Sequence, residues 1–523
     1  MGALLRQLAA QKQPAPDDAP PVTAGMLLGT AGLVLFAFLY YIDERMASAA
    51  AADLRGGFRQ GSDDGSWLST AYTLGQVLMI PMTPWLAMVF SPRRMAAVLI
   101  VVTVLSAAAL TAHQSYATVI ALRLLQGFGE GGSVPLMLGA ILQVIPPYRK
   151  PEALTVYGLV VTIPVAASFS LSGVAVDFAG WRWLLSSAPL LGPVALFLVL
   201  TFLPKKPIEW SAFYKADYFG LFCLTAAAAS LVVACDQGQR LDWFDSGFID
   251  ALFVLFAWFA VCFVLNTLWR PDALYALSTF RKPNFTIGLL EIGVFSASLL
   301  GASMLFPMEQ EQLRYLRPLQ VGNTLLWLGI PLACVASMLP FLLRHVDARP
   351  VLALGLTLGC IGSWLCVWLS PAWAGHDYLP FLLLQATGWL MVMVTNAFLT
   401  TGVLEPKDML TGSAMFNLTR TLGFSAGGAI VTAIVTVRER VHSNANVVRS
   451  LDPGRPPVQH YIAQVQADPL ATRLATLGQA QARVLSYADA WGWLAIALLV
   501  ALALTLILAP AKVMIPPGRP TKP

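Results

Sequence analysis

The sequence carries little charge. Of its 523 residues only 12% are Asp, Glu, Lys or Arg, whereas 57% are hydrophobic. A soluble globular domain has about twice that charged fraction, so a protein exposed only to water is excluded. The apolar surplus must face another medium, and lipid is the obvious candidate. The net charge of +5 is too diffuse to indicate a nucleic-acid partner.

Cysteine is also scarce, and its pattern excludes two classes of site. None of the cysteines has metal-ligand spacing, and no arrangement suggests a disulfide framework. We therefore expect small apolar fillers, no metal site and no cofactor. No nucleotide-binding loop or nucleophile elbow is legible either, which disfavours an ATP-driven pump and an enzyme with catalytic residues. The six are Cys223, Cys235, Cys262, Cys334, Cys360 and Cys366.

What the sequence has instead is a series of long apolar runs. A helix that spans a bilayer needs about 20 mainly apolar residues. Fourteen runs meet this length, and the alternation typical of a β-barrel is missing. The predicted fold class is therefore an all-α membrane protein with fourteen transmembrane helices. The predicted spans are 24–52, 66–90, 95–113, 116–145, 152–177, 181–203, 216–235, 247–269, 284–306, 320–343, 349–370, 378–404, 411–437 and 488–511.

The lysines predict the orientation. With an even number of spans both ends lie on one side, and all nine lysines, from Lys12 to Lys522, fall in segments on that side. Cytoplasmic loops carry an excess of Lys and Arg, so we expect an N-in/C-in protein of the bacterial inner membrane. The first apolar run is long and no small-residue cleavage site follows it, which argues against a cleaved signal peptide.

The spans divide into six, two and six. Five charged residues between Asp236 and Asp250 mark the segment that joins the seventh span to the eighth. Two sets of six suggest duplicated halves around a site near the middle of the membrane. The predicted units are a disordered cytoplasmic tail (1–23), an N-terminal six-helix bundle (24–203), an inserted helix pair (204–270), a C-terminal six-helix bundle (271–511) with a long periplasmic loop (438–487), and a cytoplasmic tail (512–523).

Ionisable residues inside the apolar runs are candidate functional residues, because a charge in lipid is costly. The fourth span is the most informative, since Arg123, Gln126 and Glu130 are spaced to share one stripe of a helix. A buried acid beside an arginine can take up a proton on one side of the membrane and release it on the other. The alternative is a satisfied ion pair, for example of Arg123 with Asp43, that only holds helices together. Further candidates are Glu44, Arg45, Glu291 and Arg420.

The fourth span also contains a cluster of glycines. Gly127, Gly129 and Gly132 formally match a dinucleotide-binding fingerprint, but no strand precedes them and they lie inside an apolar run. Together with Gly131 they are expected to let a neighbouring helix approach closely, as small residues do in membranes.

Several motifs resemble the fourteen-helix drug:proton antiporter family of the major facilitator superfamily, the EmrB/QacA type. Arg123-Leu124-Leu125-Gln126-Gly127 is similar to the R-x-x-Q-G motif of that family, whose arginine is tied to proton coupling. The most specific match is the segment Gly412–Gly423, followed by a long outer loop and a last helix. The fifth span departs from the family, because its antiporter motif G-P-x-x-G-G reads Ser168–Gly173 and keeps only the final glycine.

The resemblance implies a proton-coupled secondary transporter that exports small amphipathic molecules by alternating access. Asp43 and Arg123 would form the coupling pair, with Glu130 and Glu291 as further protonation or cation-binding residues. Residues expected at the substrate cavity or at gates are Gln126, Asn417, Arg420, Phe285, Phe295 and Trp389, the three aromatic residues having helix packing as their alternative role. Residues expected at close helix contacts are Gly127, Gly131, Gly173 and Gly423.

Two other functions stay open on the sequence. One is a dedicated exporter of a metabolite, siderophore or lipid, and the other is a membrane sensor or assembly partner that does not transport. The resemblance also implies partners, since Gram-negative relatives dock a periplasmic adaptor protein and an outer-membrane channel. The loop 438–487 would contribute to that docking. Its alternative is a solvated connector whose second part extends the last helix outward from about Ala471.

Overall fold

A computed structural model describes most of the chain. The described residues are 23–112, 115–270, 273–370, 372–444, 456 and 469–510. The predicted tails 1–23 and 512–523 lie outside them, apart from Thr23, and so does most of the middle of the predicted loop 438–487. All secondary-structure elements of the described residues are helices.

The helices fall into two groups joined by a pair. The first group, here called the N-terminal group, comprises α2 (Ala24–Ala49), α3 (Ala51–Gly57), α4 (Ser62–Phe90), α5 (Pro92–Ala112), α6 (Tyr116–Gly131), α7 (Ser133–Val144), α8 (Lys150–Val174) and α9 (Ser187–Phe202). The short α10 (Trp210–Tyr214) leads to the pair α11 (Tyr218–Gly238) and α12 (Gly247–Trp269). The C-terminal group comprises α13 (Leu277–Phe280), α14 (Pro283–Ser298), α15 (Phe306–Arg314), α16 (Pro318–Leu325), α17 (Gly329–His345), α18 (Ala348–Leu365), α19 (Leu379–Thr401), α20 (Met409–His442) and α22 (Pro469–Thr505).

Thirteen described helices are long and apolar enough to cross a membrane. The run that is missing from this set is the predicted fourth span, 116–145. Here the chain forms two shorter helices, α6 and α7, which meet at Gly132. The interruption is one residue long, and Gly132 keeps right-handed helical dihedral angles (φ −79°, ψ −13°), so each part falls short of a full span although helix covers nearly the whole predicted run. The total of fourteen crossings stays a prediction.

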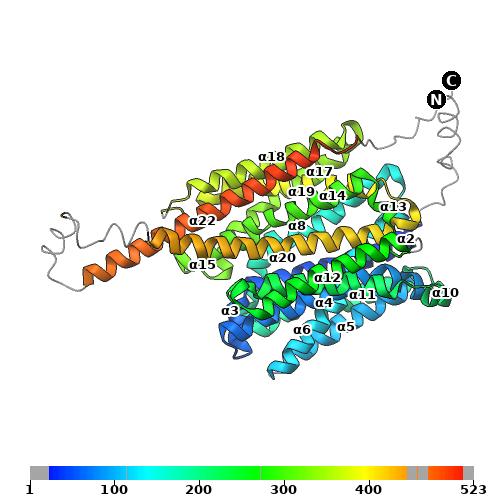
Figure 1. Cartoon of the computed structure of the whole chain (residues 1–523), viewed down its shortest axis with the longest axis horizontal. Coiled ribbons are helices and arrows are strands. Elements are labelled where there is room, and N and C mark those ends of the chain that lie inside the picture. Colours follow the sequence, from blue (N-terminus) through cyan, green and yellow to red (C-terminus); the bar gives the residue numbers. More distant parts are fainter. Residues whose placement is uncertain are drawn as a thin grey trace.

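The long helices run side by side along the longest axis of the molecule (Figure 1). The start of α2 packs against the end of α9, where Gly29 meets Leu203. The end of α22 is tied to the start of α14, because the Ala509 amide donates to the Asn284 side chain at 2.7 Å. Both described ends of the chain therefore lie at one end of the bundle, here called the terminal end. The predicted orientation of this end toward the cytoplasm is not tested by the fold.

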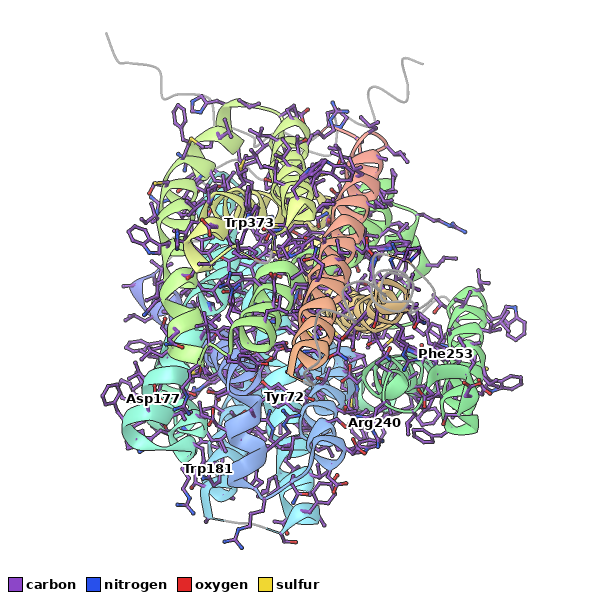
Figure 2. The ribbon with its side chains drawn as sticks, turned by 90° about the vertical axis from the view of Figure 1, so that its left-hand side faces the viewer. Tyr72, Asp177, Trp181, Arg240, Phe253 and Trp373 are labelled. Atoms are coloured by element: carbon purple, nitrogen blue, oxygen red, sulfur yellow. The ribbon has the colours of Figure 1, made fainter. Side chains whose placement is uncertain are left out.

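The two helices of the inserted pair have different surroundings. In α12 only Ile249 and Thr267 are buried, and the other residues are exposed or partly exposed. By contrast α11 packs against α4 of the N-terminal group and against α20 of the C-terminal group. Figure 2, which looks onto the end of the bundle opposite the terminal end, shows Phe253 of α12 at the edge of the bundle. The pair is thus one lipid-facing helix and one helix wedged between the groups.

Glycines allow the closest helix contacts, both within each group and between the groups. A Cβ on Gly127 of α6 would collide with the Tyr72 carbonyl of α4, and one on Gly131 would lie 2.6 Å from the Gln76 carbonyl. In the C-terminal group a Cβ on Gly423 would collide with the backbone of α14 at Gly293. Gly173 of α8 lies in the same way against Leu319 of α16. Small residues at these positions let backbones approach without a gap.

The limits predicted for the loop 438–487 are too wide. The helix α20 continues to His442, and α22 already begins at Pro469. Charged pairs hold the two helices together beyond the apolar runs, since Arg438 pairs with Asp489 and Arg483 lies 2.8 Å from Glu439. Polar pairing of this kind lets helices continue past an apolar segment, and the start of α22 at Pro469 agrees with the alternative in which the last helix extends outward from about Ala471. An adaptor-binding role for this segment stays a prediction.

Candidate functional site

Two buried acids share one amide at the centre of the N-terminal group. Asp43 lies on α2, whereas Gln126 and Glu130 lie one turn apart on α6. The Gln126 Nε2 donates to Asp43 Oδ2 at 3.5 Å and to Glu130 Oε1 at 3.3 Å. All three side chains are at most 2% exposed, and Asp43 Oδ1 has no hydrogen-bond partner. Two carboxyls this close in an apolar surrounding cannot both ionise without a large cost.

The same network extends to an arginine and a tyrosine. Arg123 donates to Gln126 Oε1 at 2.9 Å and to the Leu68 carbonyl at 3.3 Å. Its guanidinium also lies over the ring of Tyr72, 4.5 Å from the centroid. The Tyr72 hydroxyl in turn donates to Glu130 Oε2. Each acid is thus connected to Arg123 through a polar side chain that can pass on a change in charge.

The structure corrects one detail of the predicted coupling pair. Among the described residues no ion pair joins Arg123 to Asp43 or to Glu130; Gln126 stands between them. The sequence placed Arg123, Gln126 and Glu130 on one stripe, and they do lie together. The spacing of these residues in the sequence could not show that the side-chain nitrogen of Gln126 donates to both Asp43 and Glu130.

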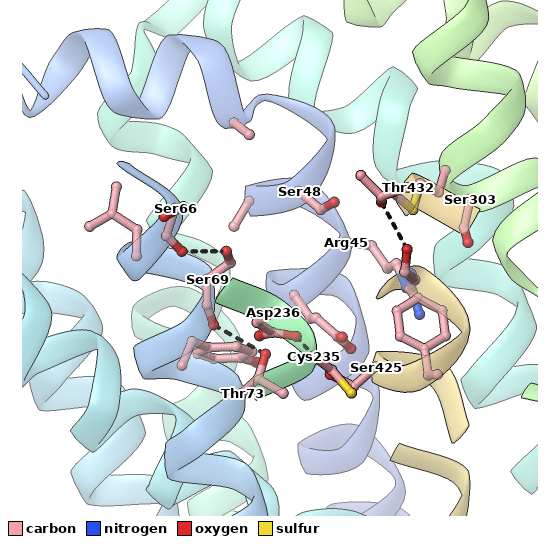
Figure 3. A pocket seen from close by; sticks show the side chains of 18 of the residues that line it. Arg45, Ser48, Ser66, Ser69, Thr73, Cys235, Asp236, Ser303, Ser425 and Thr432 are labelled. Atoms are coloured by element: carbon pink, nitrogen blue, oxygen red, sulfur yellow. Dashed lines mark hydrogen bonds between the residues drawn. The ribbon is translucent and has the colours of Figure 1, made fainter. Parts of the chain in front are cut away.

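A cavity of about 390 Å³ lies beside this network, toward the end of the bundle opposite the terminal end. Its walls come from both groups and from the inserted helix α11 (Figure 3). Ala51 and Ser69 on its wall are exposed, so the cavity communicates with the surface at that end. The lining residues that carry the arguments below are Glu44, Arg45, Tyr72, Gln76, Arg123, Asp236, Thr421, Phe424 and Ser425.

The opposite end of the bundle is closed between the groups. The Ser413 hydroxyl of α20 donates to the Pro135 carbonyl of α7 at 3.1 Å. Leu410 packs against Gly139 one turn further along. Arg344 of α17 pairs with Glu152 of α8 at the surface of the same end. The cavity therefore has access from one end only.

Two residues belong both to the acid network and to the wall of the cavity. Tyr72 and Arg123 line the cavity while they contact Glu130 and Gln126. A protonated carboxyl donates a hydrogen bond that an ionised one can only accept. A change of protonation at Glu130 therefore alters the bonding of a tyrosine that lines the cavity.

Glu291 lies in a separate network in the C-terminal group. Asn396 of α19 donates to Glu291 Oε2 and Thr505 of α22 donates to Oε1, each at 3.1 Å. Both carboxyl oxygens are satisfied by neutral donors, and Glu291 does not line the large cavity. Glu291 therefore lies apart from Asp43 and Glu130, and its role as a protonation or cation-binding residue stays a prediction.

Asn417 and Arg420 of α20 face the N-terminal group. Asn417 accepts a hydrogen bond from the Tyr157 hydroxyl of α8 at 3.4 Å, and Arg420 lies over the ring of Tyr41 of α2. These contacts cross between the two groups, as expected of residues at a gate. Neither residue lines the cavity in this conformation.

The three aromatic residues expected to face substrate do not line the large cavity either. Phe295 and Trp389 are at most 2% exposed within the core. Phe285 packs against Phe280 and borders only a pocket of about 10 Å³. Their placement agrees with the alternative role in packing, because large apolar rings are the most efficient fillers between helices.

Two further acids lie away from water, Asp236 partly buried at the cavity and Glu309 buried in the C-terminal group. Asp236 was assigned to an outer loop, but it lies in the last turn of α11 and lines the cavity. Glu309 is 2% exposed in α15, where it accepts the Tyr378 hydroxyl. The apolar runs end before both residues, and only a helix continuing beyond the run would have revealed them. Among the described residues no group of three or more His, Cys, Asp or Glu is placed to hold a metal ion.

These features define a multi-pass membrane protein with two helix groups around a central cavity. The sequence profile described as Major Facilitator Superfamily matches residues 33–428, and the chain belongs to this family. Its helices therefore form the fold of a transporter family, and a small-molecule substrate follows from that membership.

Individual relatives agree over most of the chain. The multidrug export protein EmrB of Escherichia coli is 25% identical over 455 residues, which cover 85% of this chain and 86% of the relative. The colistin resistance protein EmrB of Acinetobacter baumannii is 21% identical, with 86% of each chain covered. Among solved structures, the human organic anion transporter MFSD10 has a TM-score of 0.55 at 14% identity, covering 92% of this chain and 100% of its own, and supports the fold alone.

Proposed function

We propose that this protein is a proton-coupled secondary transporter that exports small amphipathic molecules, of the multidrug efflux type. Its relatives include multidrug export proteins that match over most of their length. The observation that carries the proton coupling is the network in which Asp43 and Glu130 share Gln126 while Tyr72 reaches the cavity wall. In the proposed cellular setting the chain lies in a bacterial inner membrane with both ends in the cytoplasm.

In the proposed cycle the structure is the outward-facing state. The cavity lies at the end away from the described chain ends, which is the outer side in the proposed orientation. A proton entering from that side would bind the Asp43 and Glu130 pair and relieve the repulsion between the two carboxyls. The altered bonding of Tyr72 and Arg123 would then change the cavity wall and lower the affinity for substrate. Release of the proton inside would follow when the closed end opens.

The closed end supplies the contacts that must break in this cycle. Ser413 with Pro135, Asn417 with Tyr157, and Arg344 with Glu152 join the two groups there or midway along the bundle. All are polar contacts of one side chain, which rigid movement of two groups can exchange for new partners. A periplasmic adaptor and an outer-membrane channel remain proposed partners, with the ends of α20 and α22 as the contact region.

The test is efflux of a panel of lipophilic cations and weak acids from cells that lack other pumps. The wild type is compared with Asp43→Asn, and with Asp250→Asn as a control that removes an exposed acid of α12. We expect efflux that a protonophore abolishes, lost in Asp43→Asn and kept in Asp250→Asn. Efflux that survives in Asp43→Asn would disprove the coupling role, and a panel of which no compound moves would redirect the search to a dedicated metabolite.

A further inference from the structure

The cavity contains an arginine that has no charged partner. Arg45 of α2 is 8% exposed, and its guanidinium lies over the Phe424 ring of α20, 4.4 Å from the centroid. Its Nε has no hydrogen-bond partner. Within the described part of the chain no ion pair involves Arg45, although Glu44 precedes it in sequence.

An acid on the inserted helix lines the same cavity, and no ion pair of the described residues involves it either. Asp236 of α11 accepts a hydrogen bond from the Ser425 hydroxyl at 2.7 Å, and Figure 3 shows it next to Cys235 and Ser425. Ser425 follows Phe424 on α20, so Asp236 and Arg45 contact consecutive residues of one helix. Glu44 of α2 lines the same cavity. Opposite charges are thus held in one cavity without forming an ion pair among the described residues.

Two buried neutral groups on the same wall also lack partners. Gln76 is 1% exposed and its Nε2 donates to no group, and the Thr421 hydroxyl of α20 is likewise unpaired. A buried polar group without a partner costs free energy, and such groups at a cavity are commonly met by a ligand. Arg45 and the Gln76 amide are both unpaired donors of one cavity wall, which indicates that the ligand brings a negatively charged or carbonyl oxygen.

We propose that the cavity binds an amphoteric molecule, one that carries both a carboxylate and a protonated amine. The carboxylate of the ligand would accept hydrogen bonds from Arg45 and Gln76, and its amine would donate to Asp236 and Glu44. A simple cation would leave Arg45 unpaired, whereas a simple anion would leave the two acids unpaired. The volume of about 390 Å³ lies in the range of sites for drug-sized ligands.

The inserted helix α11 therefore supplies part of the substrate specificity. It contributes Cys235, Asp236 and Gln239 to the cavity wall, and it is fixed to α4 by Gln237, which donates to Thr70 at 2.6 Å. This inference rests on the proposed function in taking the cavity as the substrate site. It does not depend on proton coupling or on the direction of transport.

The experiment measures binding to the purified full-length protein in lipid nanodiscs, so that a failure of export does not affect it. The probes are norfloxacin, which carries a carboxylate and an amine, its methyl ester, which is only a cation, and its N-acetyl derivative, which is only an anion. We expect norfloxacin to bind about tenfold more tightly than either derivative, the loss anticipated when a charged hydrogen-bonding partner is removed.

The variants assign each charge. Asp236→Asn keeps an acceptor for Ser425 and should remove the preference for norfloxacin over its N-acetyl derivative. Arg45→Gln should remove the preference over the methyl ester. Asp236→Glu and Arg45→Lys should restore most of each preference. Ser425→Ala breaks the hydrogen bond but keeps the charge, and should leave the preferences unchanged.

Two controls change a charge elsewhere, namely Asp250→Asn on α12 and Arg94→Gln at the terminal end. Equal affinity of the wild type for all three probes, or no binding of any, would overturn the proposal. It would equally fall if Asp236→Asn weakened all three probes alike, because that result would mean a structural role only. Loss of proton-driven export with these preferences intact would instead count against the proposed function alone.

Discussion

Each helix group buries an acid on its first long helix, Asp43 on α2 and Glu291 on α14, but the two acids have different hydrogen-bond partners. In the N-terminal group Asp43 shares Gln126 with a second acid, and one of its oxygens lacks a partner. In the C-terminal group Glu291 stands alone, with each oxygen accepting from a neutral donor. In the N-terminal group the two acids compete for one donor, so their hydrogen bonds must change with the number of bound protons; we call this pair frustrated. In the C-terminal group one set of hydrogen bonds satisfies both oxygens of Glu291. The difference leads us to predict that a buried acid takes part in proton coupling only where its surroundings leave it two alternative states.

The largest effect is expected from neutralising the frustrated pair. Glu130→Gln and Asp43→Asn should each reduce substrate transport driven by a pH gradient by about 100-fold or more, as is typical when a positioned proton-transfer group is removed. Transport is measured in proteoliposomes with an imposed gradient. Exchange of substrate at equal pH should persist, because the cavity itself is unchanged. Gradient-driven transport at wild-type rates in both variants would remove the basis of the comparison.

A smaller effect is expected from the tyrosine that connects the acids to the cavity. Tyr72→Phe keeps the ring under Arg123 but removes the hydrogen bond to Glu130. A hydrogen bond to a charged group contributes about 1.5–3 kcal/mol, so gradient-driven transport should fall about tenfold.

The matched control is Tyr378→Phe, which removes the same kind of bond to Glu309 in the C-terminal group. Since Tyr378 and Glu309 do not line the cavity, this variant should lower thermal stability and leave coupling unchanged. If both variants reduced transport equally, the bond to Glu130 would have no special part in coupling.

The two groups should respond alike where only packing is at stake. Gly127→Ala and Gly423→Ala each place a Cβ against the backbone of a neighbouring helix, α4 and α14 respectively. Overpacking of this kind costs about 1–3 kcal/mol, so both variants should melt several degrees lower. Gly428→Ala is the control on α20, because nothing lies within 4 Å of its added Cβ. Thermal unfolding followed by size-exclusion chromatography measures all three, and an unshifted Gly423→Ala would show that α14 and α20 separate easily.

The sequence was informative wherever local pattern determines structure. Apolar runs predicted all of the long helices, and the spacing of Arg123, Gln126 and Glu130 predicted that they lie together. The shared superfamily was predicted from the motif around Arg123 and from Gly412–Gly423, and it is confirmed by the match over residues 33–428.

The sequence was uninformative where contacts join distant segments. Asp236 reaches the cavity because α11 is wedged between α4 and α20, a placement that no run of hydropathy encodes. Glu309 is buried because a helix continues past the apolar run. The one-residue interruption at Gly132 was not predicted, since a glycine in a membrane helix is common and does not by itself signal an interruption. The sequence also could not show that Phe285 lies away from the large cavity, because an aromatic ring fills a core as well as it lines a substrate surface.

The smallest effect is expected at the satisfied acid, and it tests the comparison most directly. In Glu291→Gln the amide oxygen can accept from Asn396 while the amide nitrogen donates to the Thr505 hydroxyl, so no buried partner is left unmet. Gradient-driven transport should stay within about twofold of wild type, since no group that changes its proton count has been lost. Glu291→Ala, by contrast, leaves donors without an acceptor and should destabilise the C-terminal group by about 1–3 kcal/mol. The two variants are compared in the same proteoliposome and melting assays as Glu130→Gln. The contrary result is a Glu291→Gln variant that melts normally but has lost gradient-driven transport. It would show that an acid whose oxygens all have hydrogen-bond partners can still belong to the proton pathway, and that the C-terminal group carries a second coupling site.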